Sequence, residues 1–70
     1  MKYYVSYVSN GDLQLGEGAV TEWTNLDAAK GKFHDLCALL WKYTTTNTAC
    51  VAIIDNALNI VQGYREYISK

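Results

Sequence analysis

A sustained helical period runs through residues 25–43 and constrains the fold more than any other feature of the chain. Apolar side chains recur there at intervals of three and four, so a helix would gather them into one stripe. The stripe consists of Leu26, Ala29, Phe33, Leu36, Cys37, Leu40 and Tyr43. Thr24 or Asn25 can cap its start, and Asp27 suits a capping box from Thr24 and the positive end of the helix dipole. Such a stripe needs an apolar partner surface, which the flanking segments must supply.

The segment before the helix predicts a β-hairpin. Residues 2–9 alternate between two faces, neither of them strongly polar, which is typical of a strand with material on both sides. Asn10 and Gly11 predict a type I′ turn, because both residues readily adopt positive φ angles. The second strand, residues 13–23, is interrupted at residues 16–18, where two glycines indicate a bulge, a bend or a disordered patch.

The segment after the helix predicts a second hairpin. The threonine-rich residues 44–48 end the helix, since β-branched side chains favour extended backbone. Residues 50–54 are continuously apolar, which indicates a central strand buried on both faces. Residues 55–59 form the turn, and Gly63 marks a bend in the last strand, residues 60–68. Simple alternation places Ile60, Tyr64 and Ile68 on one face of that strand and Val61, Arg65 and Tyr67 on the other.

These elements predict a single α+β domain spanning residues 1–70. Its order is ββαββ, with one helix packed on one face of a four-stranded sheet. The sheet is mixed if the second and third strands are neighbours, joined by a right-handed crossover. It is antiparallel if the first strand lies between them. We favour the second arrangement, in the order second, first, third, fourth, because it places the two most apolar strands in the middle.

Composition and charge restrict the class of function. Half of the residues are hydrophobic and 19% are charged, as in globular proteins. The net charge is −1 and no run of Lys or Arg reaches three residues, which argues against nucleic-acid binding. We see no signal peptide and no membrane-spanning run of about 18 apolar residues, so we expect a cytoplasmic protein with no membrane contact. Its two cysteines are then expected to be free thiols.

Three side chains could begin a metal or thiol site. His34 and Cys37 lie one helical turn apart, and Cys50 starts the central strand. A closed zinc site normally takes four ligands, and no fourth ligand has a suitable spacing. A catalytic Cys37–His34 pair needs an exposed thiol, whereas the apolar stripe places Cys37 in the core. We therefore favour two buried thiols and a histidine on the helix surface, and keep a small metal or thiol protein as an alternative.

Nothing else in the chain predicts catalysis. The seven carboxylates are dispersed among turns, strand edges and the helix surface, so no pair is placed in a common cleft. The glycines at residues 16 and 18 do not precede a helix at the spacing of a phosphate-binding loop. We therefore expect a non-enzymatic protein with no cofactor and no small-molecule substrate.

The aromatic residues point to an interaction surface. Nine aromatic side chains in 70 residues are more than one helix can cover, and strand alternation sends rings to both sheet faces. Aromatic and arginine side chains are enriched at interface hot spots. We therefore predict partner binding, in a homodimer or to another protein, by Tyr4, Arg65 and Tyr67 on the open sheet face and by Trp41 on the helix. Alternatively, the tyrosines only cover an open sheet face. A stacking platform for single-stranded nucleic acid is a further alternative, which lacks a basic groove.

The chain also resembles small uncharacterised ββαββ proteins of bacterial and phage or prophage genomes. The resemblance covers nearly the whole chain and rests on generic fold-building residues. These are Lys-Tyr-Tyr-Val-Ser-Tyr at residues 2–7, Leu-Asp-Ala-Ala-Lys at 26–30, Phe33, His34, Val-Ala-Ile-Ile-Asp-Asn at 51–56 and Asn-Ile-Val at 59–61. It implies a cytoplasmic accessory protein, and a phage-encoded binder or inhibitor of a host protein is one role it implies. It supplies no catalytic motif.

Overall fold

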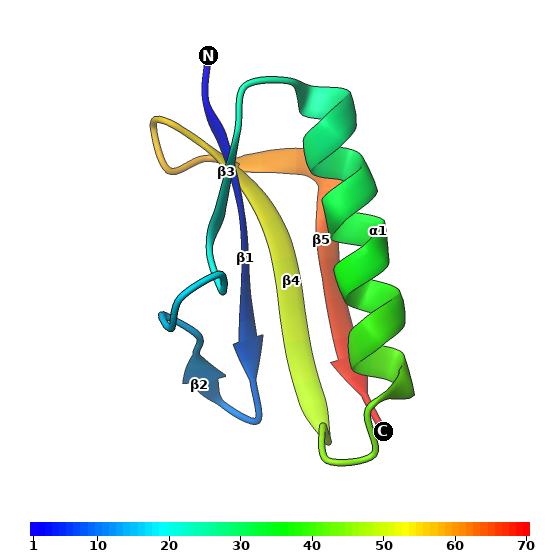
Figure 1. Cartoon of the computed structure of the whole chain (residues 1–70). Helices are drawn as coiled ribbons and strands as arrows, with labels where there is room; N and C mark the ends of the chain where they lie inside the picture. The colour runs from blue at the N-terminus through cyan, green and yellow to red at the C-terminus, as the bar shows by residue number, and fades with distance from the viewer.

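A single helix lies across one face of an antiparallel sheet of five strands, which gives the chain an α+β fold (Figure 1). The computed structural model describes all residues, 1–70. In chain order the elements are β1 (Tyr3–Ser9), β2 (Asp12–Leu13), β3 (Thr21–Trp23), α1 (Leu26–Lys42), β4 (Thr48–Asp55) and β5 (Ile60–Ser69). The predicted fold class and the position of the helix on one face are therefore confirmed.

The predicted number of four strands is wrong, because the expected second strand is divided in two. β2 pairs with the C-terminal end of β1, and β3 pairs with its N-terminal end. Between them the chain turns at Gly18, whose φ of +78° is unfavourable for residues with a side chain. The N–H of Ala19 donates to the carbonyl of Gly16 at 3.0 Å within this turn. The two glycines therefore break the strand rather than bend it.

The strand order β2-β1-β4-β5, with β3 also beside β1, agrees with the predicted order of second, first, third and fourth. All neighbouring strands are antiparallel, so the sheet is not mixed. β1 and β4 pair along seven residues, from Tyr3 with Asp55 to Ser9 with Ala49. The predicted type I′ geometry agrees with the positive φ angles of Asn10 and Gly11. The two most apolar strands thus occupy the centre of the sheet.

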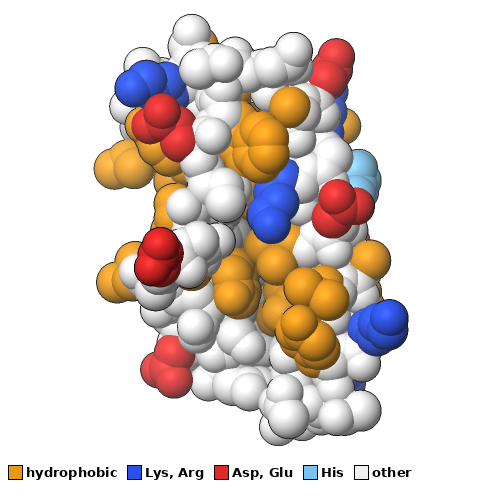
Figure 2. Space-filling model, in the orientation of Figure 1, with side chains coloured by type: hydrophobic (Ala, Val, Ile, Leu, Met, Phe, Trp, Pro, Cys, Tyr) orange, Lys and Arg blue, Asp and Glu red, His pale blue; other side chains and the backbone are white.

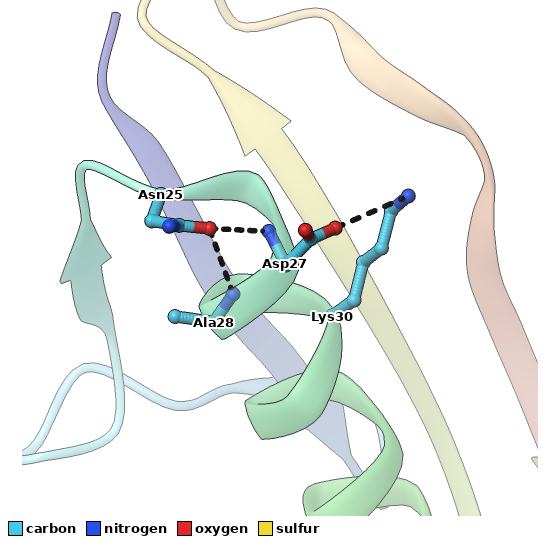
Figure 3. Close-up of polar contacts among 4 residues, drawn as sticks. All are labelled: Asn25, Asp27, Ala28 and Lys30. Carbon is cyan, nitrogen blue, oxygen red and sulfur yellow. Dashed lines mark hydrogen bonds and ion pairs between the residues drawn. The ribbon is translucent and has the colours of Figure 1, made fainter.

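Asn25 starts the helix. Its side-chain Oδ1 accepts hydrogen bonds from the backbone N–H groups of Asp27 at 2.8 Å and Ala28 at 3.2 Å (Figure 3). Figure 3 also shows the Asp27 carboxylate directed toward Lys30, with an N–O distance of 4.0 Å. Of the two predicted caps, the structure therefore uses Asn25, and the capping box from Thr24 does not form. α1 lacks the length and apolar character of a membrane-crossing helix.

The core lies between α1 and the sheet and confirms most of the predicted stripe. Its ten buried residues are Val5, Ala29, Phe33, Leu36, Cys37, Leu40, Ala49, Val51, Ile53 and Ile68. Leu26 packs against this cluster and is partly buried. The inclusion of Tyr43 in the stripe is wrong: it is the C-cap, with an extended backbone (φ −70°, ψ 123°), and its side chain is half exposed. The helix ends at Lys42, so the helical period no longer directs the side chain of Tyr43 toward the sheet.

Gly63 changes which face the start of β5 presents to the helix. Figure 1 shows β5 bending sharply near its beginning, and the pairing register with β4 shifts between Ala52 and Ile54. Gly63 has a φ of +85°, as expected at a bulge. Beyond the bulge Ile60 pairs with Ile54, while Val61 packs against the core. The predicted faces of Ile60 and Val61 are therefore wrong, because residues 61–64 lie opposite the single residue Ile53 and this odd excess inverts the alternation.

Asn10 fastens the loop between α1 and β4 to the first hairpin. Its Oδ1 accepts from the backbone N–H groups of Asn47 at 2.8 Å and Thr48 at 3.2 Å, and its Nδ2 donates to the Thr45 carbonyl at 3.0 Å. These bonds join segments more than thirty residues apart in the sequence. They hold the beginning of β4 beside the end of β1, where the central pair of the sheet starts.

Candidate interaction surface

The sheet face opposite α1 has no covering layer and carries mostly apolar side chains. We call it the open face. Strand alternation directs every second residue to it, and antiparallel pairing aligns these residues in three rows across the strands. The first row is Leu13, Val8, Cys50 and Tyr67, the second is Ser6, Ala52 and Arg65, and the third is Glu22, Tyr4, Ile54 and Ile60. The first and third rows run from the β2 and β3 edge of the sheet, across β1 and β4, to β5, whereas the second row begins at β1.

Exposure on the open face rises from the centre toward both edges. The residues that β1 and β4 contribute are half-buried, because their cross-strand neighbours cover their flanks. The edge residues Tyr67, Leu13 and Ile60 have exposed fractions of 60%, 57% and 50%. The expectation that residues 50–54 are buried on both faces is therefore wrong for this side of β4. The run is continuously apolar, yet only its helix-facing side chains are covered.

Charges on the open face lie at its two edges. On the β3 edge the Glu22 carboxylate forms an ion pair with Lys2, with an N–O distance of 3.7 Å. On the β5 edge lies Arg65, which pairs across the sheet with Ala52. The interior of the face between these edges is formed by small and apolar residues and by the Tyr4 ring.

The structure brings three of the four predicted partner-binding residues to one face. Tyr4, Arg65 and Tyr67 all lie on the open face. Trp41 does not join them: its Nε1 donates to Glu66 Oε2 at 3.1 Å, and Glu66 pairs with Val51 on the helix side of the sheet. The indole is half exposed and bridges α1 and β5.

The sequence prediction missed several members of the open face. Leu13 could have been placed from the hairpin alone, since a two-residue turn at Asn10 and Gly11 sets the register of the strands beside it. Ile60 could not, because its face depends on the bulge at Gly63. Ile54 follows from alternation along β4 once that strand is known to have one uncovered side.

Further exposed apolar side chains lie on the helix side of the molecule. Figure 2 shows hydrophobic side chains gathered along the lower half of α1. Leu39, Trp41 and Tyr43 are exposed in this part of the chain. Leu39 and Trp41 stand two residues apart in α1 and therefore lie on different sides of the helix, so these side chains do not form one surface comparable with the open face.

The three residues proposed for a metal or thiol site lie in different surroundings. His34 is exposed on α1, with its ring edge-to-face against Phe33 at 5.4 Å between centroids. Cys37 is buried in the core, and Cys50 lies half-buried on the open face. The prediction of two buried thiols is therefore wrong for Cys50, because its side of β4 is uncovered. Both cysteines are free, and no three His, Cys, Asp or Glu side chains gather in a metal-binding arrangement.

Burial controls the chemistry of Cys37. Desolvation, followed by the nearby Glu66 carboxylate, raises the pKa of the Cys37 thiol to about 12. Both effects disfavour the negatively charged thiolate. The reactive form of this cysteine is therefore scarce at neutral pH, and the exposure that a nucleophilic cysteine needs is absent at this position.

The candidate site is thus a surface and not a cavity, since no pocket is found on the protein. The open face combines three rows of mostly apolar residues, a cation at one edge and an ion pair at the other. Comparisons with protein-family models, with curated proteins and with solved structures found no match to this chain.

Proposed function

We propose that this chain is a non-enzymatic protein-interaction module that self-associates by packing its open face against the open face of a second copy. The observation that carries the proposal is the uncovered open face, most of whose side chains are apolar. Large contiguous apolar patches are rare on the surfaces of monomeric proteins and usually mark interaction surfaces. The tyrosines and Arg65 on this face belong to the residue types that dominate binding energy at interfaces.

The small size of the core supports self-association. Only 11 of 70 residues are buried, so little apolar surface is removed from water within one copy. Domains of this size often add disulfides, a metal or association with other chains to reach useful stability. Both cysteines are free, and no three possible metal ligands gather in one place. Association through the open face is therefore the source of added stability that the side chains favour.

The dimensions of the open face support a weak rather than a tight dimer. Strands about 4.8 Å apart and residues about 3.4 Å apart give a face of roughly 19 by 24 Å in outline, or roughly 450 Å². A standard stable interface buries about 800 Å² of accessible surface per partner. We therefore expect dissociation constants in the micromolar range, about −8 kcal/mol in binding free energy.

Sedimentation equilibrium from about 1 μM to about 1 mM protein tests the proposal, since this range brackets the expected dissociation constant. The key variant is Ala52→Glu, which places a charge at the centre of the open face. The matched control is Leu39→Glu, which adds the same charge to an exposed apolar position of α1. We expect wild type and Leu39→Glu to dimerise and Ala52→Glu to stay monomeric with unchanged circular dichroism. A monomeric wild type over the whole range, or an unaffected Ala52→Glu dimer, would refute the proposal.

We also propose that the module works in the cytoplasm. The free state of both cysteines supports this location, because secreted domains of this size usually rely on disulfides. Fractionation of cells that express a tagged full chain tests it. Recovery in an oxidising compartment, with either cysteine in a disulfide, would contradict it.

A further inference from the structure

The edge charges of the open face cannot meet within one copy. Glu22 lies in β3 and Arg65 lies in β5, with β1 and β4 between them. Three strand spacings separate the two positions, or about 14 Å. Each charge therefore remains at the rim of an apolar face, where only a second molecule can bring an opposite charge to Arg65.

Two symmetric arrangements stack one open face on another with the strands aligned, and the charges distinguish them. A homodimer normally has a two-fold axis, so every contact occurs twice. The axis lies in the plane between the two sheets. If it runs perpendicular to the strands in that plane, β5 lies over β5 of the second copy, and Arg65 faces Arg65. If the axis is parallel to the strands, β1 lies over β4 of the second copy, and β5 lies over β3 and β2. Only the second arrangement brings Arg65 toward Glu22.

From this complementarity, and resting on the proposed self-association, we infer that the open face docks a second copy about an axis parallel to the strands, with Arg65 of each copy bound to Glu22 of the other. The two residues lie one row apart, roughly 7 Å along the strand. Both side chains point into the space between the sheets, which is about 10 Å in stacked sheets. The long arginine side chain can cover this offset.

The row pattern also suits this arrangement. In the first row Tyr67 of one copy lies over Leu13 of the other, so the two most exposed edge residues of that row cover each other. In the second row Arg65 lies beyond Ser6 of the other copy, and neither β2 nor β3 pairs with Ser6. The guanidinium therefore meets no strand at this point and lies beside the neighbouring Glu22.

The existing partner of Glu22 does not prevent the exchange. Lys2 and Glu22 are both more than half exposed and are 3.7 Å apart, so their ion pair contributes little to stability. Arg65 offers a planar fork that binds a carboxylate with two hydrogen bonds, and partial removal from water at the interface strengthens such a pair. The contact would select this register over the like-charged alternative, which fits the general role of interface charges in specificity.

Charge reversal tests the inference. In Arg65→Glu homodimers both inter-copy pairs become carboxylate with carboxylate, and in Glu22→Arg homodimers both become cation with cation. We expect each single variant to dimerise about tenfold more weakly than wild type or worse. Mixing the two variants restores both pairs in the heterodimer, and the double variant Arg65→Glu with Glu22→Arg restores them in a homodimer. Sedimentation equilibrium measures dimerisation of the single variants, of their mixture and of the double variant. In the mixture, one of the two variants carries a fluorescent label.

Matched controls and outcomes separate this inference from the proposed function. Lys42→Glu and Asp35→Arg make the same charge changes at exposed positions of α1 and are expected to leave dimerisation unchanged. If Ala52→Glu abolishes the dimer while single reversals of Arg65 and Glu22 do not weaken it, the pairing is wrong and the open-face dimer stands. If the double variant dimerises more weakly than the single variants, the pairing is also wrong. If wild type is monomeric, both proposals fail. Thermal unfolding followed by circular dichroism confirms that each variant is folded.

Discussion

The two cysteines provide a sensitive test of how the sheet divides the molecule into two faces. Cys37 belongs to the core on the helix side, whereas Cys50 lies half-buried on the open face. Only the thiolate attacks a disulfide reagent such as Ellman's reagent, so reactivity reports both ionisation and access. We predict that in the native protein Cys50 reacts and Cys37 does not.

The difference follows from the pKa of Cys37. A thiol with the ordinary value of 9.0 is about one-tenth ionised at about pH 8, whereas a value of about 12 leaves about one thiolate in ten thousand. Ionisation alone therefore lowers the reactivity of Cys37 about a thousandfold, and burial of the sulfur lowers it further. In denaturant both cysteines are expected to react at similar rates, because the fold is the only cause of the difference.

Single variants allow each thiol to be measured separately. Cys37→Ala reports Cys50, and Cys50→Ala reports Cys37. We expect labelling of Cys50→Ala to be at least about a thousandfold slower in the native state than in denaturant, by the ionisation difference above, and slower than labelling of native Cys37→Ala. If Cys50→Ala reacts as fast as Cys37→Ala while its circular dichroism is native, the assignment of the two cysteines to opposite faces is wrong.

The same assay links the thiols to self-association. A dimer formed through the open face covers Cys50, so its labelling rate should fall as the protein concentration rises through the dissociation constant. The Ala52→Glu variant, which is expected to stay monomeric, should show no such fall. A constant rate at Cys50 in samples that sediment as dimers would mean that the dimer uses another surface.

Three further predictions concern stability, each measured by urea unfolding followed by tryptophan fluorescence. Because the pKa of Cys37 is raised in the fold, the unfolded state loses this proton first as the pH rises above about 9. The free energy of unfolding then falls toward pH 12 by at most about 1.4 kcal/mol per pH unit. Cys37→Ala should remove this pH dependence, and a variant with the same dependence as wild type would contradict the burial of Cys37. Asn10→Gly keeps the turn but loses three side-chain hydrogen bonds, and it should lower the free energy of unfolding by about 1 to 3 kcal/mol. Asn10→Ala should lower it by about 1 kcal/mol more, because alanine disfavours the positive φ at this position. Equal stability of wild type and Asn10→Gly would refute the role of this side chain. Asn25→Ala should cost about 1 kcal/mol through loss of the helix cap, with Asn25→Asp close to wild type; an equal loss in both variants would contradict it.

Local signals in the sequence were sufficient for much of the fold. The three- and four-residue spacing of apolar side chains identified α1 and placed Cys37 in the core, because a helix repeats its faces over a short range. Asn10 and Gly11 identified the first hairpin, because the turn imposes positive φ angles that few residues accept. The order of the strands also agreed with the prediction, because the most apolar strands bury more apolar surface at the centre of the sheet than at its edges.

Other features depended on contacts between segments far apart in the chain. The apolar run at residues 50–54 indicated burial on both sides, but the number of layers over a sheet depends on how many elements the chain can supply, and this chain has one helix. Trp41 was predicted on the helix and lies there, but its hydrogen bond to Glu66 of β5 joins two segments twenty-five residues apart. Neither the uncovered side of β4 nor the partner of the Trp41 indole has a signal in the local pattern.

The open face shows most clearly where the sequence stops and the tertiary structure decides. Alternation alone assigned Tyr4, Arg65 and Tyr67 to one face, since strand residues alternate whenever pairing is regular. Ile60 joined them only through the irregularity around Gly63, where residues 61–64 of β5 lie opposite the single residue Ile53 of β4, an odd excess that inverts the alternation beyond it. Whether a glycine in a strand bends it, breaks it or shifts its register depends on the strand beside it, so the composition of this surface was decided by the pairing of β5 with β4.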